Sequence, residues 1–343
     1  MPLTSAVGRT AQIGVARQTA GEGTPIVPTS SSANTSFMKF QSGSKVRPQS
    51  TIVREFEGDG QRGQGLQTKK AQWGMGKLIT LARPNDLAYL LGAFCGAGSD
   101  TVTAPVAPAV NSGHAIVPAS SNNNDYFTIV QNLAGGYLRQ VSDAICTKLV
   151  LSASKDAPWL KADSDWMGTT TTQSGAVTSA QFQPNMPFLF FGVNFSNPIA
   201  SLNGALQALT ITLDAPVTMT DFQTESVTGN PLKAANIVVT FDISVLWQDG
   251  GAAAYAYYGS TAGLTDAIQL PMGALAATFQ CQDDTTQTTT LTLPNAAFDE
   301  DDFEPDPSGK PVIQKITGGS IRTAGNPAFS AVVTCTGAAK YSS

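Results

Sequence analysis

The residues best suited to chemistry are few and dispersed in this chain. Its single histidine, His114, stands among Asn, Ser and Gly, where we expect a solvated loop side chain. The cysteines lie far apart with no C-x-x-C spacing, which indicates small buried thiols. Histidine-dependent hydrolases and zinc sites need a placed histidine or clustered cysteines, so the chain is predicted to be no enzyme and to hold no metal or cofactor. The cysteines are Cys95, Cys146, Cys281 and Cys335.

One glycine-rich stretch, Gly58–Gly65 (GDGQRGQG), has the G-x-G-x-x-G spacing of a dinucleotide site. That site needs a helix opening at the last glycine. Here the alternating run LQTKKAQWGMGKLITL follows instead and predicts a strand. We interpret residues 43–69 as a long flexible loop between two strands, either solvated or acting as an arm that contacts a neighbouring molecule. Its charged residues are Arg54, Glu55, Glu57, Asp59, Arg62, Lys69 and Lys70.

The acidic residues form no recognisable site. The densest run, Phe298–Pro307 (FDEDDFEPDP), lacks the ligand spacing and turn glycine of a calcium loop. We interpret it as a solvated loop, with a weak cation site or a partner contact as alternatives. Asp163 and Asp165 lie close to two tryptophans, but nothing in the sequence places them across a glycosidase cleft.

The composition is unusually poor in charge. Only 13% of the 343 residues are charged, about half the usual quarter, and the net charge is -5. The surface is therefore either covered by uncharged polar side chains or largely buried against other subunits, since interface cores are depleted in charge. An acidic chain is unsuited to clamping phosphates. No secretion leader and no membrane span are expected.

The coarse pattern predicts a mainly β protein with one short helix in each half. The clearest helix is PNDLAYLLGAFCG, over Pro84–Gly96, with Asn85 or Asp86 as its cap. It is expected to cover the open face of a sheet with one apolar stripe. Gly135-Gly136 predicts a hairpin between two alternating runs. The helix stripe consists of Leu87, Leu90, Leu91 and Phe94.

The order of elements indicates a duplicated unit. A strand, a polar loop, a long alternating strand and a short helix occur twice, and DGGAAAYAYYG supplies the second helix. The long strand of the second copy is expected to bury Phe241 and to turn Asp242 away from the core. Residues 99–124, rich in Ala, Pro and Asn, are interpreted as an extended loop. The predicted parts are an arm (1–36), a first lobe (37–168), a linker (169–185) and a second lobe (186–343).

Several stretches together resemble the tail tube, or major tail, proteins of long, flexible-tailed (siphophage-type) bacteriophages. They include AQIGVARQTAGEGTPIVPTS, LQTKKAQWGMGKLITLARPNDLAYLLGAFCG and YFTIVQNLAGGYLRQVSDAICTKLVLSAS. DSDWMG, MPFLFFGVNFS, LQALTITLDAPV and NIVVTFDISVLW extend the likeness over most of residues 10–300. The resemblance implies two tandem β-sandwich or barrel-like lobes, each with one flanking helix.

The resemblance also implies a virion protein that is assembled in the bacterial host cytoplasm. Such chains form rings stacked into a hollow tube through which double-stranded DNA passes without specific binding. Two fused lobes favour trimeric, pseudo-hexameric rings, with hexameric rings as the alternative. Further implied partners are the tape measure, tail terminator and distal tail or baseplate proteins. The resemblance implies no contact with a membrane.

Two hypotheses follow for the assembled state. Residues 43–69 reach the adjacent ring, and acidic residues on the long strands line the channel, where they would repel phosphates and let DNA slide. Alternative functions are another β-rich virion or secretion-tube protein, such as a capsid decoration protein or a ring of the secreted-tube type, and a β-sandwich carbohydrate-binding domain. The lining candidates are Asp214, Asp221, Glu225 and Asp242.

Overall fold

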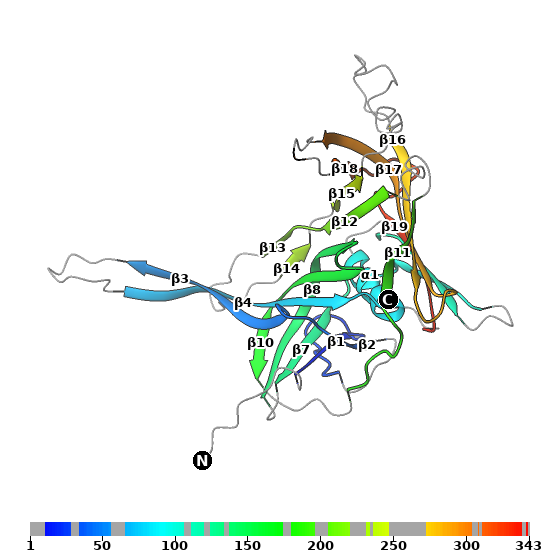
Figure 1. Ribbon diagram of the computed structural model, residues 1–343. Helices are drawn as coiled ribbons and strands as arrows, with labels where there is room; N and C mark the ends of the chain where they lie inside the picture. The colour runs from blue at the N-terminus through cyan, green and yellow to red at the C-terminus, as the bar shows by residue number, and fades with distance from the viewer. Residues whose placement is uncertain are drawn as a thin grey trace.

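The computed structural model of the chain is built from β-strands around a helix (Figure 1). The mainly β fold class is therefore confirmed. The predicted second helix, within residues 249–259, lies outside the described residues. The structure describes residues 11–28, 34–55, 66–105, 111–119, 124–133, 137–173, 180–195, 205–219, 231–233, 236–246, 272–303, 308, 311–337 and 341.

A first antiparallel sheet has the strand order β2–β1–β7–β8–β10. β7 and β8 form the hairpin that Gly135-Gly136 predicted, with Leu133 paired to Tyr137. The strands are β1 (Gln12–Arg17), β2 (Thr35–Met38), β7 (Phe127–Leu133), β8 (Tyr137–Ser154) and β10 (Thr170–Gln173).

The long strand β8 passes from this sheet into a second one through a bend at Asp143. Asp143 has φ of 51°, a left-handed conformation that aspartate tolerates better than most residues. Its carboxylate accepts hydrogen bonds from the Gly23 N–H at 2.7 Å and the Thr169 hydroxyl at 2.9 Å. These contacts hold the bend, and beyond it β8 pairs with β9 and β12.

The second sheet runs β3–β4–β9–β8–β12–β15–β18–β17, all antiparallel. On β15 Phe241 is 3% exposed and the alternate residue Asp242 points away from the core, as predicted. The strands not yet given are β3 (Lys45–Glu55), β4 (Leu66–Leu81), β9 (Lys161–Gly168), β12 (Leu206–Asp214), β15 (Val238–Leu246), β17 (Thr288–Phe303) and β18 (Ile313–Ser320).

The other half of β17 belongs to a further layer, ordered β11–β16–β17–β19–β6–β5. Two of its strands fall within 99–124, so the extended loop expected there is wrong for residues 100–103 and 112–116. The acidic run 298–307 likewise begins within β17 rather than in a loop. The strands are β5 (Asp100–Thr103), β6 (Ser112–Ile116), β11 (Phe188–Phe195), β16 (Met272–Cys281) and β19 (Ser330–Cys335), with a separate pair β13 (Val217–Met219) and β14 (Pro231–Lys233).

Helix α1 (Pro84–Cys95) lies at the centre of these layers (Figure 1). It begins with Pro84 at its first turn after Arg83, which makes no side-chain cap, so the predicted cap at Asn85 or Asp86 is wrong. All twelve helix residues are buried, not only the predicted stripe, because α1 packs against strands of different sheets: β2, β6, β8 and β19. Gly96 ends the helix with φ of 91°.

The two halves of the sequence share hydrogen-bonded strands. β8 pairs with β12, and β6 pairs with β19. Buried apolar side chains from both halves form one continuous cluster. The division into two lobes with boundaries at 37–168 and 186–343 stays a prediction.

Candidate assembly surfaces

The most prominent surface feature is a two-stranded ribbon made by β3 and β4. The two strands pair along the whole length of β3, and the ribbon projects away from the body (Figure 1). Its inner end is fixed where the Val46 N–H donates to Gln131 Oε1 over 3.1 Å and the Arg139 guanidinium donates to the Val46 carbonyl. The expectation of a flexible loop over residues 43–69 is therefore wrong for its described part.

The ribbon carries four of the seven residues predicted for ring stacking. Arg54 is exposed near the outer end of β3, and Glu55 is the last residue of that strand. Lys69 and Lys70 lie on β4, where the pairing register shifts by one residue opposite Thr51 and Ile52. The other three lie outside the described residues: Glu57, Asp59 and Arg62.

Pro48 is the sequence signal that should have identified this strand. A proline cannot donate to a ladder, so within sheets it is found on edge strands. Pro48 pairs with Gly74 of β4, and the only strand pairing that the described residues give β3 is with β4. β3 is thus an edge strand, and an open edge is a ready template for pairing with another chain.

The ribbon is basic although the chain as a whole is acidic. Among residues 45–55 and 66–71 there are five cationic residues and one acidic residue, against a net charge of -5 for the full sequence. Charge of one sign gathered on a projecting element indicates contact with a surface of the opposite sign. The cationic residues are Lys45, Arg47, Arg54, Lys69 and Lys70.

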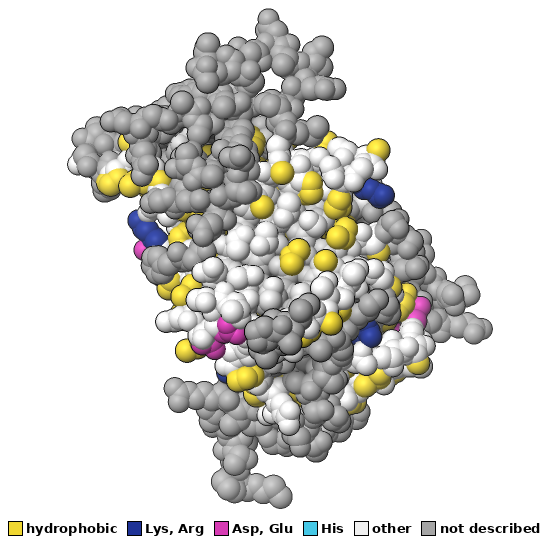
Figure 2. All heavy atoms as spheres, turned by 90° about the vertical axis from the view of Figure 1, so that its right-hand side faces the viewer, with side chains coloured by type: hydrophobic (Ala, Val, Ile, Leu, Met, Phe, Trp, Pro, Cys, Tyr) yellow, Lys and Arg dark blue, Asp and Glu magenta, His cyan; other side chains and the backbone are white. Residues whose placement is uncertain are grey.

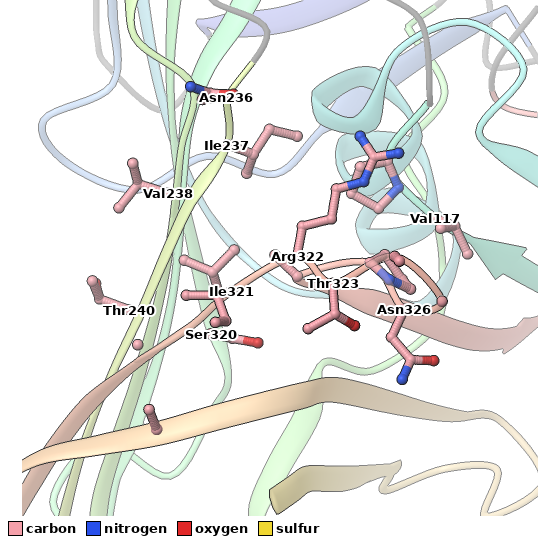
Figure 3. A pocket seen from close by; sticks show the side chains of 18 of the residues that line it. Val117, Asn236, Ile237, Val238, Thr240, Ser320, Ile321, Arg322, Thr323 and Asn326 are labelled. Atoms are coloured by element: carbon pink, nitrogen blue, oxygen red, sulfur yellow. The ribbon is translucent and has the colours of Figure 1, made fainter. Parts of the chain in front are cut away.

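A pocket of about 710 Å³ lies between the segment after β6, the start of β15, β17 and the connection from β18 to β19 (Figure 3). Its apolar lining includes Val117, Val238 and Ile321, which are 39%, 52% and 53% exposed. Arg322 and Asp299 also line it. The pocket is therefore a mainly apolar hollow with one cation and one carboxylate among its lining residues.

Two of the four predicted channel-lining acids lie in the described structure, on neighbouring strands. Asp214 ends β12, and Asp242 on β15 lies 3.1 Å from the Lys315 ammonium. That exposed ion pair lowers the charge Asp242 contributes to any surface. Asp221 and Glu225 lie outside the described residues.

The described surface is short of charge on the face drawn in Figure 2. Acidic and basic side chains there are few and separated, with small apolar groups scattered between uncharged ones. Both explanations offered for the composition, an uncharged polar surface and extensive subunit contacts, remain compatible with this face.

The C-terminal segment is held in a buried socket beside α1. His114 lies on β6 and is 0% exposed, so the expectation of a solvated loop histidine is wrong. Its Nδ1 is 2.9 Å from the Asp100 carboxylate and its Nε2 is 2.9 Å from the Gly337 carbonyl. Because both ring nitrogens face acceptors, both must donate, and the ring is a cation. Asp100 also accepts from the Tyr341 N–H at 2.8 Å.

Helix α1 completes this socket from its other side. The Asn85 side-chain carbonyl accepts from the Gly337 N–H at 3.3 Å, and its amide donates to the Thr336 hydroxyl at 3.0 Å. Gly92 leaves room for Tyr341, since a Cβ there would lie 3.2 Å from the Tyr341 Cβ. The Asn85 side chain therefore fastens the C-terminal segment instead of capping its own helix.

Asp86 is a buried carboxyl, which the sequence pattern predicted only as a possible helix cap. It is 1% exposed; the Ser36 hydroxyl donates to its Oδ1 at 3.1 Å, while its Oδ2 has no hydrogen-bond partner among the described residues. Burial raises the pKa of Asp86 to about 6, opposed by the Ser36 hydrogen bond and the charges of Arg83 and Lys39. The folded protein thus holds this proton at a pH where the unfolded chain has released it.

We expect the Asp86→Asn variant to be more stable than the wild type at pH 7.5. The raised pKa makes stability fall as the pH rises from about 4 to 6, and the ionised group then costs about 1–3 kcal/mol. Urea unfolding of both proteins at pH 4.5 and 7.5 measures this, with Asp156→Asn, at an exposed position, as the control. A variant less stable than wild type by the same amount at both pH values would contradict it.

The described residues hold a charged triplet in place of a catalytic pair. Asp163 and Asp165 share one face of β9 and lie 3.0 and 3.5 Å from the Lys77 ammonium. Burial lowers the pKa of Lys77, but the hydrogen bonds and charges of the two carboxylates outweigh it and raise the pKa overall. Both carboxylates therefore lie beside a fixed cation.

No group of three potential metal-ligating side chains occurs among the described residues, and none of their helices is long and apolar enough to cross a membrane. No protein-family profile and no curated protein matches this sequence. All four cysteines are buried and unpaired by disulfides, as predicted.

Proposed function

We propose that the chain is the structural subunit of a siphophage-type tail tube. Identical copies assemble into rings, the rings stack, and double-stranded DNA passes through the hollow centre. The resemblance in sequence suggests this function, and the mainly β fold is compatible with it. The ribbon of β3 and β4 is the observation that carries the proposal.

The ribbon is an element that needs a partner. A two-stranded hairpin is at best marginally stable in water without a further layer. Thr51 and Ile52 on its outer part are exposed, as is Arg47 near its inner end. A second copy of the chain could cover the exposed side chains of the ribbon and pair with the open edge of β3. Both contacts would stabilise the ribbon.

The acidic character of the chain supports a channel through which DNA slides. An acidic wall repels phosphates, whereas a basic wall would hold them. Among the predicted acids of the lining, Asp214 and Asp242 lie on adjacent strands β12 and β15, whose register places Thr210 opposite Asp242. A net positive potential in the bore of the assembled particle would defeat this part of the proposal.

Electron microscopy of the purified chain tests the proposal. Copies that join through ribbon and edge should give stacked rings or hollow rods. Isolated rings that never stack would favour a secretion-type ring, and single compact particles would favour a binding domain.

A further inference from the structure

The pocket described above gathers a large part of the exposed apolar surface. Eight large hydrophobic side chains are exposed among the described residues, and three of them line this one pocket. Val117, Val238 and Ile321 come from three different segments, and in Figure 3 Ile321 lies between the other two, which are at opposite sides of the lining. Solvent-exposed apolar side chains that gather in one hollow indicate a surface that another molecule covers.

The strand that borders the pocket is acidic. Asp299 lines the pocket from β17, and the next three residues of the same strand, Glu300, Asp301 and Asp302, are also acidic. Lys315 of β18 lies opposite Asp302 in the ladder and Arg322 lines the pocket, so acidic residues outnumber cations here by four to two. The receiving surface is therefore an apolar hollow beside a strand with an excess of acidic residues.

The ribbon carries an exposed apolar side chain and positive charge, which complement the apolar pocket and its acidic border. Ile52 is 43% exposed on β3, and its strand neighbours in the ladder include Lys69 of β4. Arg47 and Arg54 lie on either side of Ile52 along β3. One exposed apolar side chain among cations complements an apolar hollow beside carboxylates.

We propose that the pocket receives the outer part of the β3–β4 ribbon from a second copy of this chain. Ile52 of one copy packs against Ile321 in the pocket of the other, and the basic ribbon lies beside the acidic part of β17. This inference rests on the proposed function, because it names the contact through which the copies join.

The contact is head-to-tail. In Figure 1 the ribbon leaves the body to the left, whereas β15, β17 and β18 lie at the upper right. Each copy therefore offers a ribbon in one direction and a pocket in another. Such heterologous contacts propagate and end only when the array closes on itself, which fits a ring or a helical stack.

Disulfide trapping between separately made variants tests the contact. Ile52→Cys and Ile321→Cys chains are mixed and oxidised, and a covalent dimer is expected in the mixture. The native cysteines do not compete, because all four are buried. The matched control pairs Ile52→Cys with Val332→Cys, an apolar residue of β19 that is 49% exposed and lies outside the pocket lining. The Ile321→Cys mixture should yield at least about tenfold more dimer, the ratio that a preference of 1.4 kcal/mol gives.

Assembly of a charged variant gives a second readout. Ile321→Lys replaces the apolar contact with a cation that repels the basic ribbon, and it should raise the concentration needed for assembly by about tenfold or more. Rods that form normally from Ile321→Lys, with equal cross-linking to Ile321→Cys and Val332→Cys, would overturn the pocket contact and leave the proposed function standing. A wild-type chain that stays monomeric at every concentration would overturn both.

Discussion

Replacing residues 50–72 with an Asn-Gly turn is expected to abolish assembly while leaving the body folded. Gln49 and Trp73 are paired across the ribbon, so a two-residue turn can join them directly. The change removes Ile52, the outer cations and the outer part of the free edge of β3 in one step. We expect no sedimenting particles at concentrations tenfold above those at which the wild type assembles, an effect of at least about 1.4 kcal/mol per contact.

Two controls separate loss of assembly from loss of folding. Circular dichroism and thermal unfolding should show the strand content and stability of the body retained, because the ribbon is fastened at Val46, outside the replaced segment. The smaller deletion of Gly58–Gly65 should also give a folded protein that makes no tubes. Normal tubes from the Asn-Gly variant would show that the ribbon has no part in the assembly.

Breaking the buried ion pair beside α1 should have the largest effect on stability. His114→Gln removes the cation from Asp100, whose carboxylate is fully buried, and leaving a buried charge unpaired costs about 3–5 kcal/mol. The double variant Asp100→Asn with His114→Gln should lose less stability than His114→Gln, because it leaves no buried carboxylate without its cation. Chemical unfolding at pH 6 measures all three proteins.

The effect of His114 should depend on pH in a defined direction. Burial lowers the pKa of His114, but the Asp100 hydrogen bond, the Cys335 side chain and the Gly337 carbonyl outweigh it and raise the pKa to about 10. The folded pKa lies above the unfolded value of about 6.5, so the stabilisation is complete below that pH and is lost as the pH rises towards 10. The difference in the free energy of unfolding between wild type and His114→Gln should therefore become smaller as the pH rises from 6 to 9.5. A gap of equal size at both pH values would show that the ring does not act as a cation.

The elements that the sequence pattern predicted well are those fixed by local chemistry. Pro84 and Gly96 bracket the helix, and the alternation around Phe241 gives the buried face of β15, because each depends on neighbouring residues alone. Gly135-Gly136 correctly predicted the β7–β8 hairpin.

The errors have one physical origin in long-range contacts. His114 has a polar local neighbourhood, and it is buried because Asp100 and the distant Gly337 satisfy it. Asn85 resembles a cap locally, yet its side chain binds Thr336 far along the chain. Polar residues whose hydrogen-bond partners are far away in the sequence give no periodic signal. A sequence pattern therefore assigns them to loops.

The candidate surface was found in part. The charged residues around Gly58–Gly65 predict a contact arm, but the sequence pattern predicts a loop where the structure has paired strands with an open edge at Pro48. The pocket could not be predicted, because Val117, Val238 and Ile321 come from segments that only the sheet order brings together.

Electron microscopy of the purified wild-type chain over a range of concentrations distinguishes a tube subunit from other β-rich proteins. We expect rods with a hollow axis and a regular axial repeat, which grow in length as the concentration rises. Separate compact particles at every concentration, or solid fibrils without a bore, would contradict it.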